Sequence, residues 1–199
     1  INIDTGADIT ATGNAKISIN GTSGVGSTDS YGVGFESSNV AGTTVSSVNG
    51  DITVTGVSTD TTGQRNSGVR FEDSVGATAF LLNTTGAGNL NVTGTAGNND
   101  PTSFGIQFAE DALLTLSGTS NTFIADRIEI GASNVGINAG ANAVSVRQLT
   151  NSRSINLGGA DSATELGLTD AELDRITAGT INIGNSNSGL ISVTGVICP

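Results

Sequence analysis

Short bursts of alternating apolar and polar residues recur along the chain, separated by stretches rich in Gly, Asn, Asp and Ser. The first kind of burst reads apolar, any residue, apolar, any residue, Gly, and occurs at 15–22, 51–58 and 89–96. Side chains alternate between the two faces of a β-strand, so each burst predicts a strand with one buried face. The polar stretches favour tight turns and predict loops between the strands.

A second motif follows each of these strands, at 31–36, 67–72 and 104–109. Its frame is Gly, an apolar residue, any residue and Phe, with Phe35, Phe71 and Phe108 in equal positions. Both motifs recur at intervals of about 36 to 38 residues, a period typical of solenoids. Two independent motifs with one period predict stacked copies of one unit, with the three Phe side chains stacked inside the core.

This pattern predicts an all-β, right-handed parallel β-helix, or β-solenoid, with the right-handed winding that is the default for parallel crossovers. An antiparallel sandwich also uses short strands, but its strands are not copies of one another at a constant long period. If each period holds two coils of about 18 or 19 residues, the chain makes roughly ten coils. At the ~4.8 Å spacing between strands, that is a rod on the order of 50 Å long.

The last third of the chain departs from this regularity. Variants of Ile-x-Ile-Gly recur at 127–131, 154–158 and 180–184, now about 26 residues apart. We therefore expect one solenoid over 1–199, with regular repeats in 1–126 and irregular coils in 127–199.

A short helix is expected near 169–177 within this irregular part. Thr169 and Glu172 have the spacing of a capping box, and Leu173 and Ile176 follow at helical offsets. We expect this helix to pack Leu168, Leu173 and Ile176 onto the rod.

The sequences GDITVTG (50–56), NLNVTGT (89–95) and LGLTDAELDRITAGTINIG (166–184), followed by ISVTG (191–195), resemble the repetitive passenger regions of very large bacterial exoproteins. These are the filamentous-haemagglutinin-like and autotransporter-like adhesins. The resemblance covers nearly the whole chain, but its motifs are structural repeats. It implies a right-handed parallel β-helix, secretion, and a role in adhesion, aggregation or filament formation at the cell surface.

Composition and charge exclude most other classes. The chain has no His and a single Cys, Cys198, so the usual nucleophile–base triads and the imidazole or thiolate metal sites are missing. We expect no enzyme activity, no catalytic residues, no cofactor and no metal. Seven basic against eighteen acidic residues give a net charge of −11, which argues against nucleic acid and anionic membranes as partners. No apolar run approaches the ~20 residues of a membrane helix.

One group of carboxylates lies in register with the Phe motif. Glu36 and Glu72 follow the Phe directly, Glu110 comes one step later, and Asp73 and Asp111 adjoin the last two. With two coils per period, these side chains would line one edge at intervals of about 10 Å. Such an edge could bind cations or glycans weakly. We interpret it as a solvated acidic edge that discourages lateral aggregation.

Two alternatives to a purely structural role stay open. β-Helices also bind or cleave polysaccharides, and Glu110 and Asp111, with Arg70 or Arg127, could serve in such a site. A flat face with threonine ladders can bind ice, and Thr53, Thr55 and Thr93 are candidates for such a ladder. The first repeat has Ser18 and Asn20 at the corresponding positions, so the ladder is expected to be broken.

The sequence thus predicts a rigid repetitive rod for surface display, adhesion or filament formation outside the cell. Its expected partners are neighbouring repeats or copies of itself, stacked end to end, and host or environmental glycans. The reason is that a solenoid has two open ends whose strands must be capped or extended.

Overall fold

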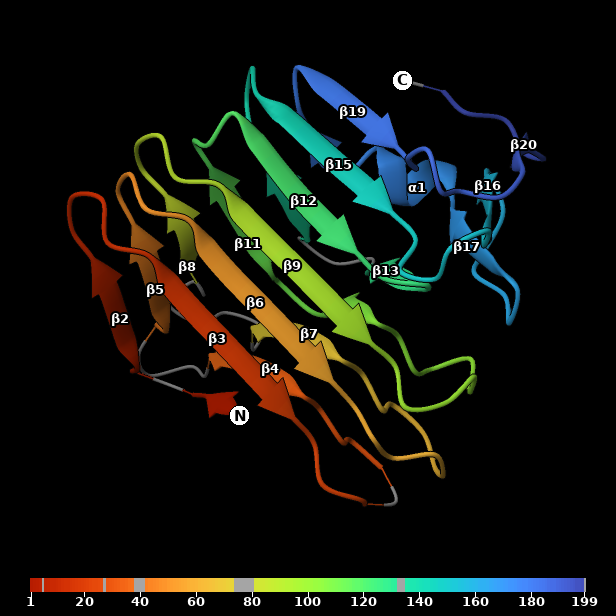
Figure 1. The fold of residues 1–199 in the computed structure, drawn as a ribbon, viewed down its shortest axis with the longest axis horizontal. Helices are drawn as coiled ribbons and strands as arrows, with labels where there is room; N and C mark the ends of the chain where they lie inside the picture. Colours follow the sequence, from red (N-terminus) through yellow and green to blue (C-terminus); the bar gives the residue numbers. More distant parts are fainter. Residues whose placement is uncertain (5, 27, 38–41, 74–80, 132–134, 199) are drawn as a thin grey trace.

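The computed structural model describes residues 1–4, 6–26, 28–37, 42–73, 81–131 and 135–198. Within these residues the chain is almost entirely strand and loop (Figure 1). The neighbouring strands of each sheet pair in parallel and are joined by crossovers. This confirms the predicted all-β parallel β-helix.

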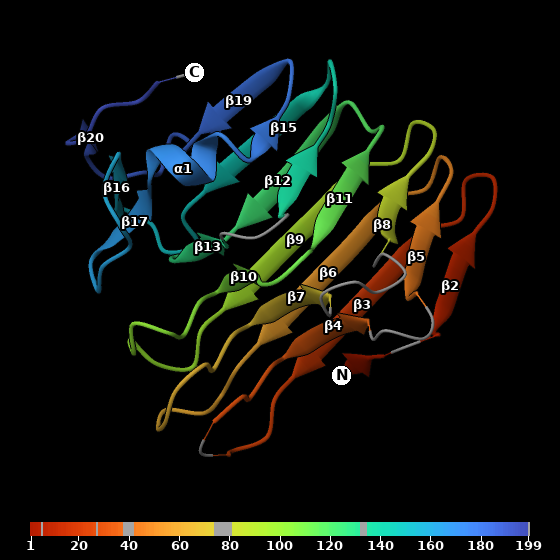
Figure 2. The same cartoon turned by 180° about the vertical axis from the view of Figure 1, so that it is seen from behind.

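Three sheets form the walls of the β-helix; sheet C faces the viewer in Figure 1, and sheets A and B face the viewer in Figure 2. Sheet A contains β1 (Asn2–Ile3), β4 (Val33–Ser37), β7 (Val69–Asp73), β10 (Ile106–Phe108) and β13 (Ile128–Ile130). Sheet B contains β2 (Asp8–Ala11), β5 (Thr44–Ser47), β8 (Leu81–Thr84), β11 (Leu113–Leu116), β14 (Gly136–Asn138) and β18 (Ile176–Thr177). Sheet C contains β3 (Ile17–Thr22), β6 (Ile52–Val57), β9 (Leu90–Thr95), β12 (Ser120–Ile124), β15 (Ala143–Arg147) and β19 (Thr180–Ile183).

One repeat period is one coil of three strands, so the expectation of two coils per period was wrong. Ile52 pairs directly with Ile17 on one side and with Leu90 on the other. Sheets B and C have six strands each, where roughly ten coils were expected. Five spacings of ~4.8 Å make the stack about 24 Å long, half the predicted length. The sequence motifs mark sheets C and A only, and sheet B takes up the rest of each period.

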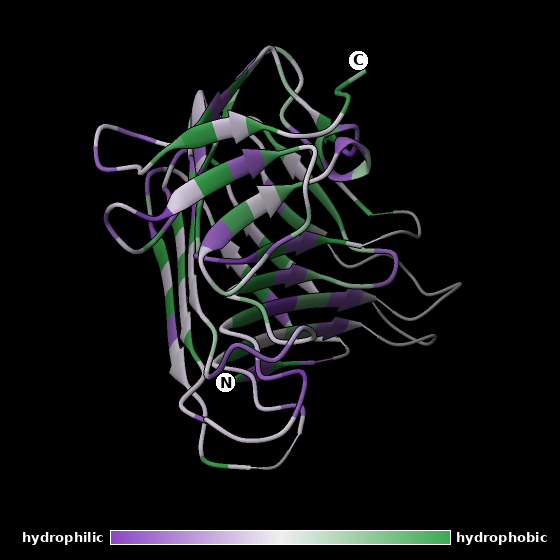
Figure 3. Ribbon diagram, turned by 90° about the vertical axis from the view of Figure 1, so that its right-hand side faces the viewer, coloured by the Kyte–Doolittle hydropathy of each residue, from purple (hydrophilic) through white to green (hydrophobic). Residues whose placement is uncertain are grey.

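The core consists of apolar columns that run along the axis of the β-helix. Phe35, Phe71 and Phe108 are fully buried and stack, with ring centroids 5.0 and 4.9 Å apart. The edge of Phe123, from sheet C, meets Phe108 with the centroids 5.8 Å apart. The inward stacking of the three repeat phenylalanines is therefore confirmed. Figure 3 shows the alternation of polar and apolar residues along the strands that makes such columns.

Three long loops lead from sheet C to sheet A, between β3 and β4, β6 and β7, and β9 and β10; we call them the excursion loops. A pair of glycines lies where the two ends of each loop come together, and we call this pair the glycine neck of the loop. A Cβ atom at Gly56 would overlap the carbonyl oxygen of Gly68, and one at Gly94 would overlap that of Gly105. The two strands approach each other here more closely than any side chain allows. This close approach, rather than a left-handed backbone, explains why the motifs of both sheets carry glycine at these positions.

The irregular region beyond residue 147 has its own small sheet, as Figure 1 shows beside sheet C. The order of this C-terminal sheet is β17 (Glu165–Leu168), β16 (Ser154–Leu157) and β20 (Ile191–Val193). The three Ile-x-Ile-Gly segments do not share a ladder: they form β13, β16 and β19, in three different sheets. Their similar spacing therefore has no single structural cause.

Helix α1 (Asp170–Leu173) begins where the capping box predicted it. Thr169 Oγ1 accepts a hydrogen bond from Glu172 N, and Glu172 Oε2 accepts one from Thr169 N. The helix ends at Leu173 and the chain enters β18 at Ile176, so it is shorter than the expected range. Leu168 and Ile176 are buried in the core and Leu173 packs against it, as predicted.

The last strand of sheet A is closed by side chains instead of another strand. Ile128 N donates to Asp161 Oδ2 at 2.8 Å, and Ile130 N donates to Glu172 Oε1 at 3.2 Å. Arg175 Nη1 donates to Ile130 O at 2.9 Å. The C-terminal region is thus fastened to the edge of β13 by two carboxylates and a guanidinium group.

Candidate functional site

A polar column crosses the outer face of sheet A. Gly34, Arg70, Gln107 and Glu129 are partners in register on β4, β7, β10 and β13. Arg70 Nη1 donates to Gln107 Oε1 at 3.0 Å, and Gln107 Nε2 donates to Glu129 Oε2 at 2.7 Å. Side chains on neighbouring strands of a parallel sheet lie close enough to form such a chain of hydrogen bonds. The column is fixed by the same strand register that builds the core.

A groove of about 580 Å³ opens where the column reaches Gly34. Gly34 has no side chain to fill this position, so the groove extends between Tyr31 on one side and the residues of β1 on the other. We call it the sheet A groove; it is lined by Ile1, Asn2, Asp29, Tyr31, Gly34, Glu36, Arg65, Arg70 and Glu72.

The only tyrosine of the chain forms one wall of this groove. The Arg70 guanidinium carbon lies 5.1 Å from the centre of the Tyr31 ring, a cation–π arrangement. Tyr31 Oη donates to Asp29 Oδ1 at 2.7 Å, and Asp29 in turn pairs with Arg65 at 2.6 Å. Burial raises the pKa of Tyr31, and the hydrogen bond to Asp29 raises it further, so the phenol stays protonated at neutral pH. The excursion loops that hold Asp29 and Arg65 are stacked on each other, which keeps this wall in place.

The carboxylates of the predicted acidic edge lie nearer to one another than expected and are partly paired. Glu36 and Glu72 are direct register partners on adjacent strands, so their backbones are one strand spacing of ~4.8 Å apart and not about 10 Å. Glu72 accepts a hydrogen bond from Arg70 Nε at 2.8 Å, and Glu36 accepts one from Asn2 Nδ2 at 3.2 Å. The side chain of Asp73 lies outside the described residues.

Of the residues considered for polysaccharide cleavage, the structure brings some together and separates others. Glu110 and Arg70 line one shallow depression of about 310 Å³, together with Glu72 and Glu129. Asp111 sits in a left-handed turn, with φ of 53°, before β11. Arg127 lies elsewhere, with its guanidinium carbon 5.0 Å from the ring centre of Phe104.

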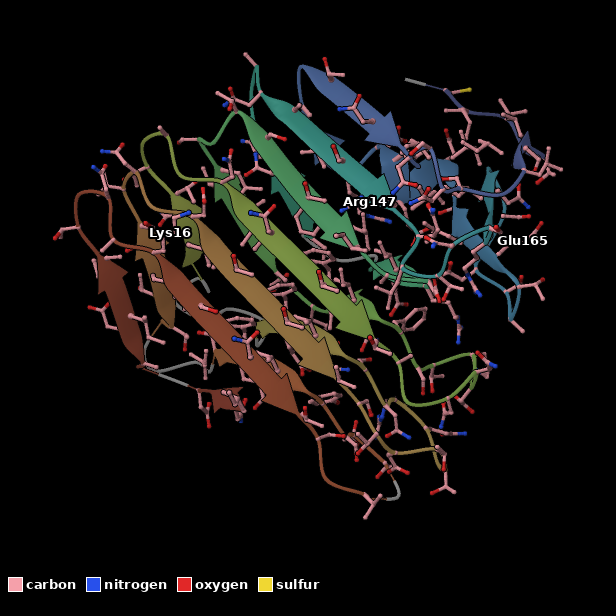
Figure 4. All side chains as sticks on the ribbon, in the orientation of Figure 1. Lys16, Arg147 and Glu165 are labelled. Carbon is pink, nitrogen blue, oxygen red and sulfur yellow. The ribbon has the colours of Figure 1, made fainter. Side chains whose placement is uncertain are left out.

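The outer face of sheet C carries short polar side chains but no continuous threonine ladder. Ser18, Thr53 and Asn91 share one column, and Asn20, Thr55 and Thr93 share the other. The second column then continues to Ile124 and Arg147. The predicted breaks in the ladder are therefore confirmed. Figure 4 labels Lys16, just before the first strand of this sheet, Arg147, at the end of its fifth strand, and Glu165 in the C-terminal sheet.

No group of three or more His, Cys, Asp or Glu residues with the arrangement of a metal site occurs among the described residues. A helix long and apolar enough to cross a bilayer is likewise missing from the described part of the chain.

The sheet A groove thus combines one aromatic ring, two guanidinium groups and several carboxylate and amide oxygens. Such a surface offers donors and acceptors to a hydroxyl-rich ligand. Sequence reasoning missed the roles of Tyr31, Gln107 and Glu129; only the uniqueness of the tyrosine was a signal. The sequence matches no protein-family model, and searches of curated proteins and of solved structures return no match.

Proposed function

We propose that this chain is a segment of a rigid extracellular β-solenoid, which lengthens by adding coils at its ends and serves surface display, adhesion or filament formation. The resemblance of its repeats to filamentous-haemagglutinin-like adhesins supports this role. The observation that carries the proposal is the match between the two ends of sheet C. The protein would act through its shape, as a stiff spacer, and not through bond-making chemistry.

Both ends of sheet C have the same ladder phase, in which the inward-facing residues of a strand form the backbone hydrogen bonds to the next strand; at the C-terminal end, Val146 O accepts from Gly184 N at 2.9 Å. Ile17 N donates to Asp51 O, and Ile52 N donates to Asn89 O, at 3.0 and 2.9 Å. Inward-facing residues therefore bond forward to the next coil. In a parallel ladder with this phase, Ile181 of β19 directs its backbone groups away from β15, and Ser18 of β3 directs its own away from β6. A strand with the sequence pattern of β3 would fit the edge of β19 in the existing register.

The C-terminal end of the β-helix also leaves apolar surface open. Ile181 is 37 % exposed, although its register partner Val144 is fully buried. Ile191 and Val193 of β20 are 45 % and 65 % exposed. Ile181 also lines an apolar cavity of about 430 Å³, together with Leu173, Asp174, Ile176, Ile183, Ile197 and Cys198. Apolar columns that end in exposed residues at an open strand edge favour further stacking.

Sedimentation velocity and negative-stain electron microscopy of the purified chain test the proposal. We expect linear assemblies one chain wide, which lengthen as ionic strength rises, because salt screens the repulsion between copies of net charge −11. Ile181→Lys should abolish assembly, since a charge on an open edge blocks strand pairing. Thr53→Lys, on the outer face of a middle strand, is the matched control. Compact monomers at all salt and protein concentrations would overturn the proposal.

Glycan binding in the sheet A groove is a second candidate function, favoured by the contact between Tyr31 and Arg70. Neutral oligosaccharides, tested by NMR titration, should perturb amides around Gly34 in the wild type. Tyr31→Ala should remove this response. A response that survives the substitution, or that appears only at residues outside the groove, would contradict the assignment.

A further inference from the structure

The segment that follows β20 folds back across the C-terminal end of the β-helix. It runs from β20 past α1 towards β19, as Figures 1 and 2 show. The start of the segment is fastened by Thr194 N, which donates to Leu157 O at 2.9 Å. Its far end is held by Cys198 N, which donates at 2.7 Å to Oδ1 of Asp170, the first residue of α1. We call residues 194–198 the end strap.

The end strap covers the last residues of the inward columns of sheet C. Ile181 and Ile183 of β19 are the register partners of Val144 and Val146, which are buried in the coil before. Ile197 of the end strap lines the same cavity of about 430 Å³ as these two isoleucines. The strap therefore shields the open end of columns that a further coil would otherwise cover.

This cover is held loosely. The amides of Gly195, Val196 and Ile197 have no hydrogen-bond acceptor among the described residues. Val196 and Ile197 are 76 % and 38 % exposed, so the strap buries little of its own apolar surface. The cavity beneath it is many times larger than the share of one water molecule, about 30 Å³, whereas protein interiors contain few voids of even that size. A segment with so few contacts opens at low cost.

A second copy stacked on β19 would need the space that the end strap covers. This step rests on the proposed stacking of β3 on β19. Continuing the register of sheet C places Ile17 of the second copy over Ile181, and Ile19 over Ile183. Both incoming side chains face the axis of the β-helix and would enter the cavity that Ile197 lines. The end strap and the second copy therefore compete for one apolar surface.

We infer that the end strap is an autoinhibitory lid on the C-terminal end of the β-helix, and that a second copy of this chain displaces it on stacking. The closed strap shields the apolar columns of a single chain. Only chains with an open strap accept a partner, so the closed strap raises the apparent dissociation constant by the inverse of the open fraction. The strap thus sets the protein concentration at which linear assemblies begin to form.

Deletion of 196–199 tests the lid, with sedimentation velocity over a range of protein concentrations as the readout. The deletion should assemble at about tenfold lower concentration than the wild type, as for a lid that is open in about a tenth of the chains. Adding Ile181→Lys should abolish this gain, because the new assemblies use the edge of β19. Asp170→Ala removes the acceptor of Cys198 N and should act in the same direction. Glu110→Ala, an exposed site with the same loss of charge, is its matched control.

A reversible disulfide gives a test within one protein. Asp174 and Cys198 line the same cavity, so Asp174→Cys should form an intramolecular disulfide with Cys198 that holds the strap closed. The oxidised monomer should stay monomeric at concentrations at which the reduced protein assembles. Asp174→Cys combined with Cys198→Ser is the control and should assemble equally with and without reductant. Failure of the disulfide to form within the monomer, or equal assembly of the oxidised and reduced proteins, would overturn the inference.

An apolar fluorescent dye, added below the concentration of assembly, separates this inference from the proposed stacking. Deletion of 196–199 should raise dye fluorescence several-fold, because it uncovers Ile176, Ile181 and Ile183 in the monomer. Equal dye fluorescence and equal assembly of the deletion and the wild type would overturn the lid and leave the stacking intact. Brighter fluorescence without assembly of any variant would overturn the stacking, and with it the displacement of the strap by a second copy.

Discussion

The regular coils and the C-terminal region differ in what bonds to the backbone N–H and C=O groups at the edge of each strand. In sheet C, from β3 to β12, each strand pairs with the equivalent strand of the next coil, and inward columns of apolar residues fill the space between the sheets. At β13 the covering groups are the side chains of Asp161, Glu172 and Arg175. Repetition stabilises the first region through neighbours on both sides, whereas the second depends on a few individual contacts.

The comparison predicts that damage in the middle of the regular columns has the largest effect. Phe71→Ala removes the ring between Phe35 and Phe108 and leaves a cavity with a neighbour on each side. We expect the free energy of unfolding to fall by about 3–5 kcal/mol. Chemical denaturation followed by circular dichroism measures the loss.

Thr53→Ala is the control for this substitution, because Thr53 is exposed on sheet C and its removal should cost less than about 0.5 kcal/mol. Hydrogen exchange should show the loss of protection in Phe71→Ala spreading to β4 and β10. A loss confined to β7 would show that the coils do not support one another.

The glycine necks predict a smaller effect with a different physical cause. Gly56→Ala places a methyl group onto the carbonyl oxygen of Gly68, and backbone atoms must move to admit it. We expect the free energy of unfolding to fall by roughly 1–3 kcal/mol, as for other overpacked sites. Gly24→Ala, where a Cβ meets nothing within 4 Å, is the matched control. Equal unfolding midpoints for the two variants would contradict the close approach of the strands.

Sequence patterns predicted the regular region well, because each column repeats the same chemistry. The alternation in AKISINGT and the in-register phenylalanines were enough to predict a parallel stack and its core. They could not count strands per coil, since sheet B carries single apolar positions such as Val45 and Leu82 without a recognisable motif. A period of about 37 residues is compatible with either number of coils.

The sheet A groove and its polar column could not be predicted, because both depend on where the repeat is broken. Gln107 pairs with Glu129 only 22 positions later, in part because only 125–127 separate β12 from β13. In the C-terminal region only the capping box was readable, because it is a local interaction between Thr169 and Glu172. Contacts such as Ile128 with Asp161 join residues 33 positions apart and follow no period.

Asp161 offers the most selective test of the comparison, because it fastens the C-terminal region without entering the regular columns. Its carboxylate oxygens accept from Ile128 N and Gly167 N, at 2.8 and 2.7 Å. Burial raises the pKa of Asp161 to about 7, although both hydrogen bonds and Arg127 act in the opposite direction. In the unfolded chain the pKa of an Asp is about 3.9.

The folded state therefore favours the protonated form of Asp161, and this contribution to stability is complete below pH ~4. It is lost as the pH rises towards 7, where the unfolded chain has already released the proton. The slope from this group is at most about 1.4 kcal/mol per pH unit. Asp161→Asn cannot titrate, so its free energy of unfolding, measured by denaturation from pH 4 to 8, should lack this decline. The amides of Ile128 and Gly167 should lose exchange protection with rising pH in the wild type, while those of β6 and β9 stay protected. Parallel pH profiles for the two proteins would show that Asp161 is solvated, and that the side-chain closure of β13 rests on Glu172 and Arg175.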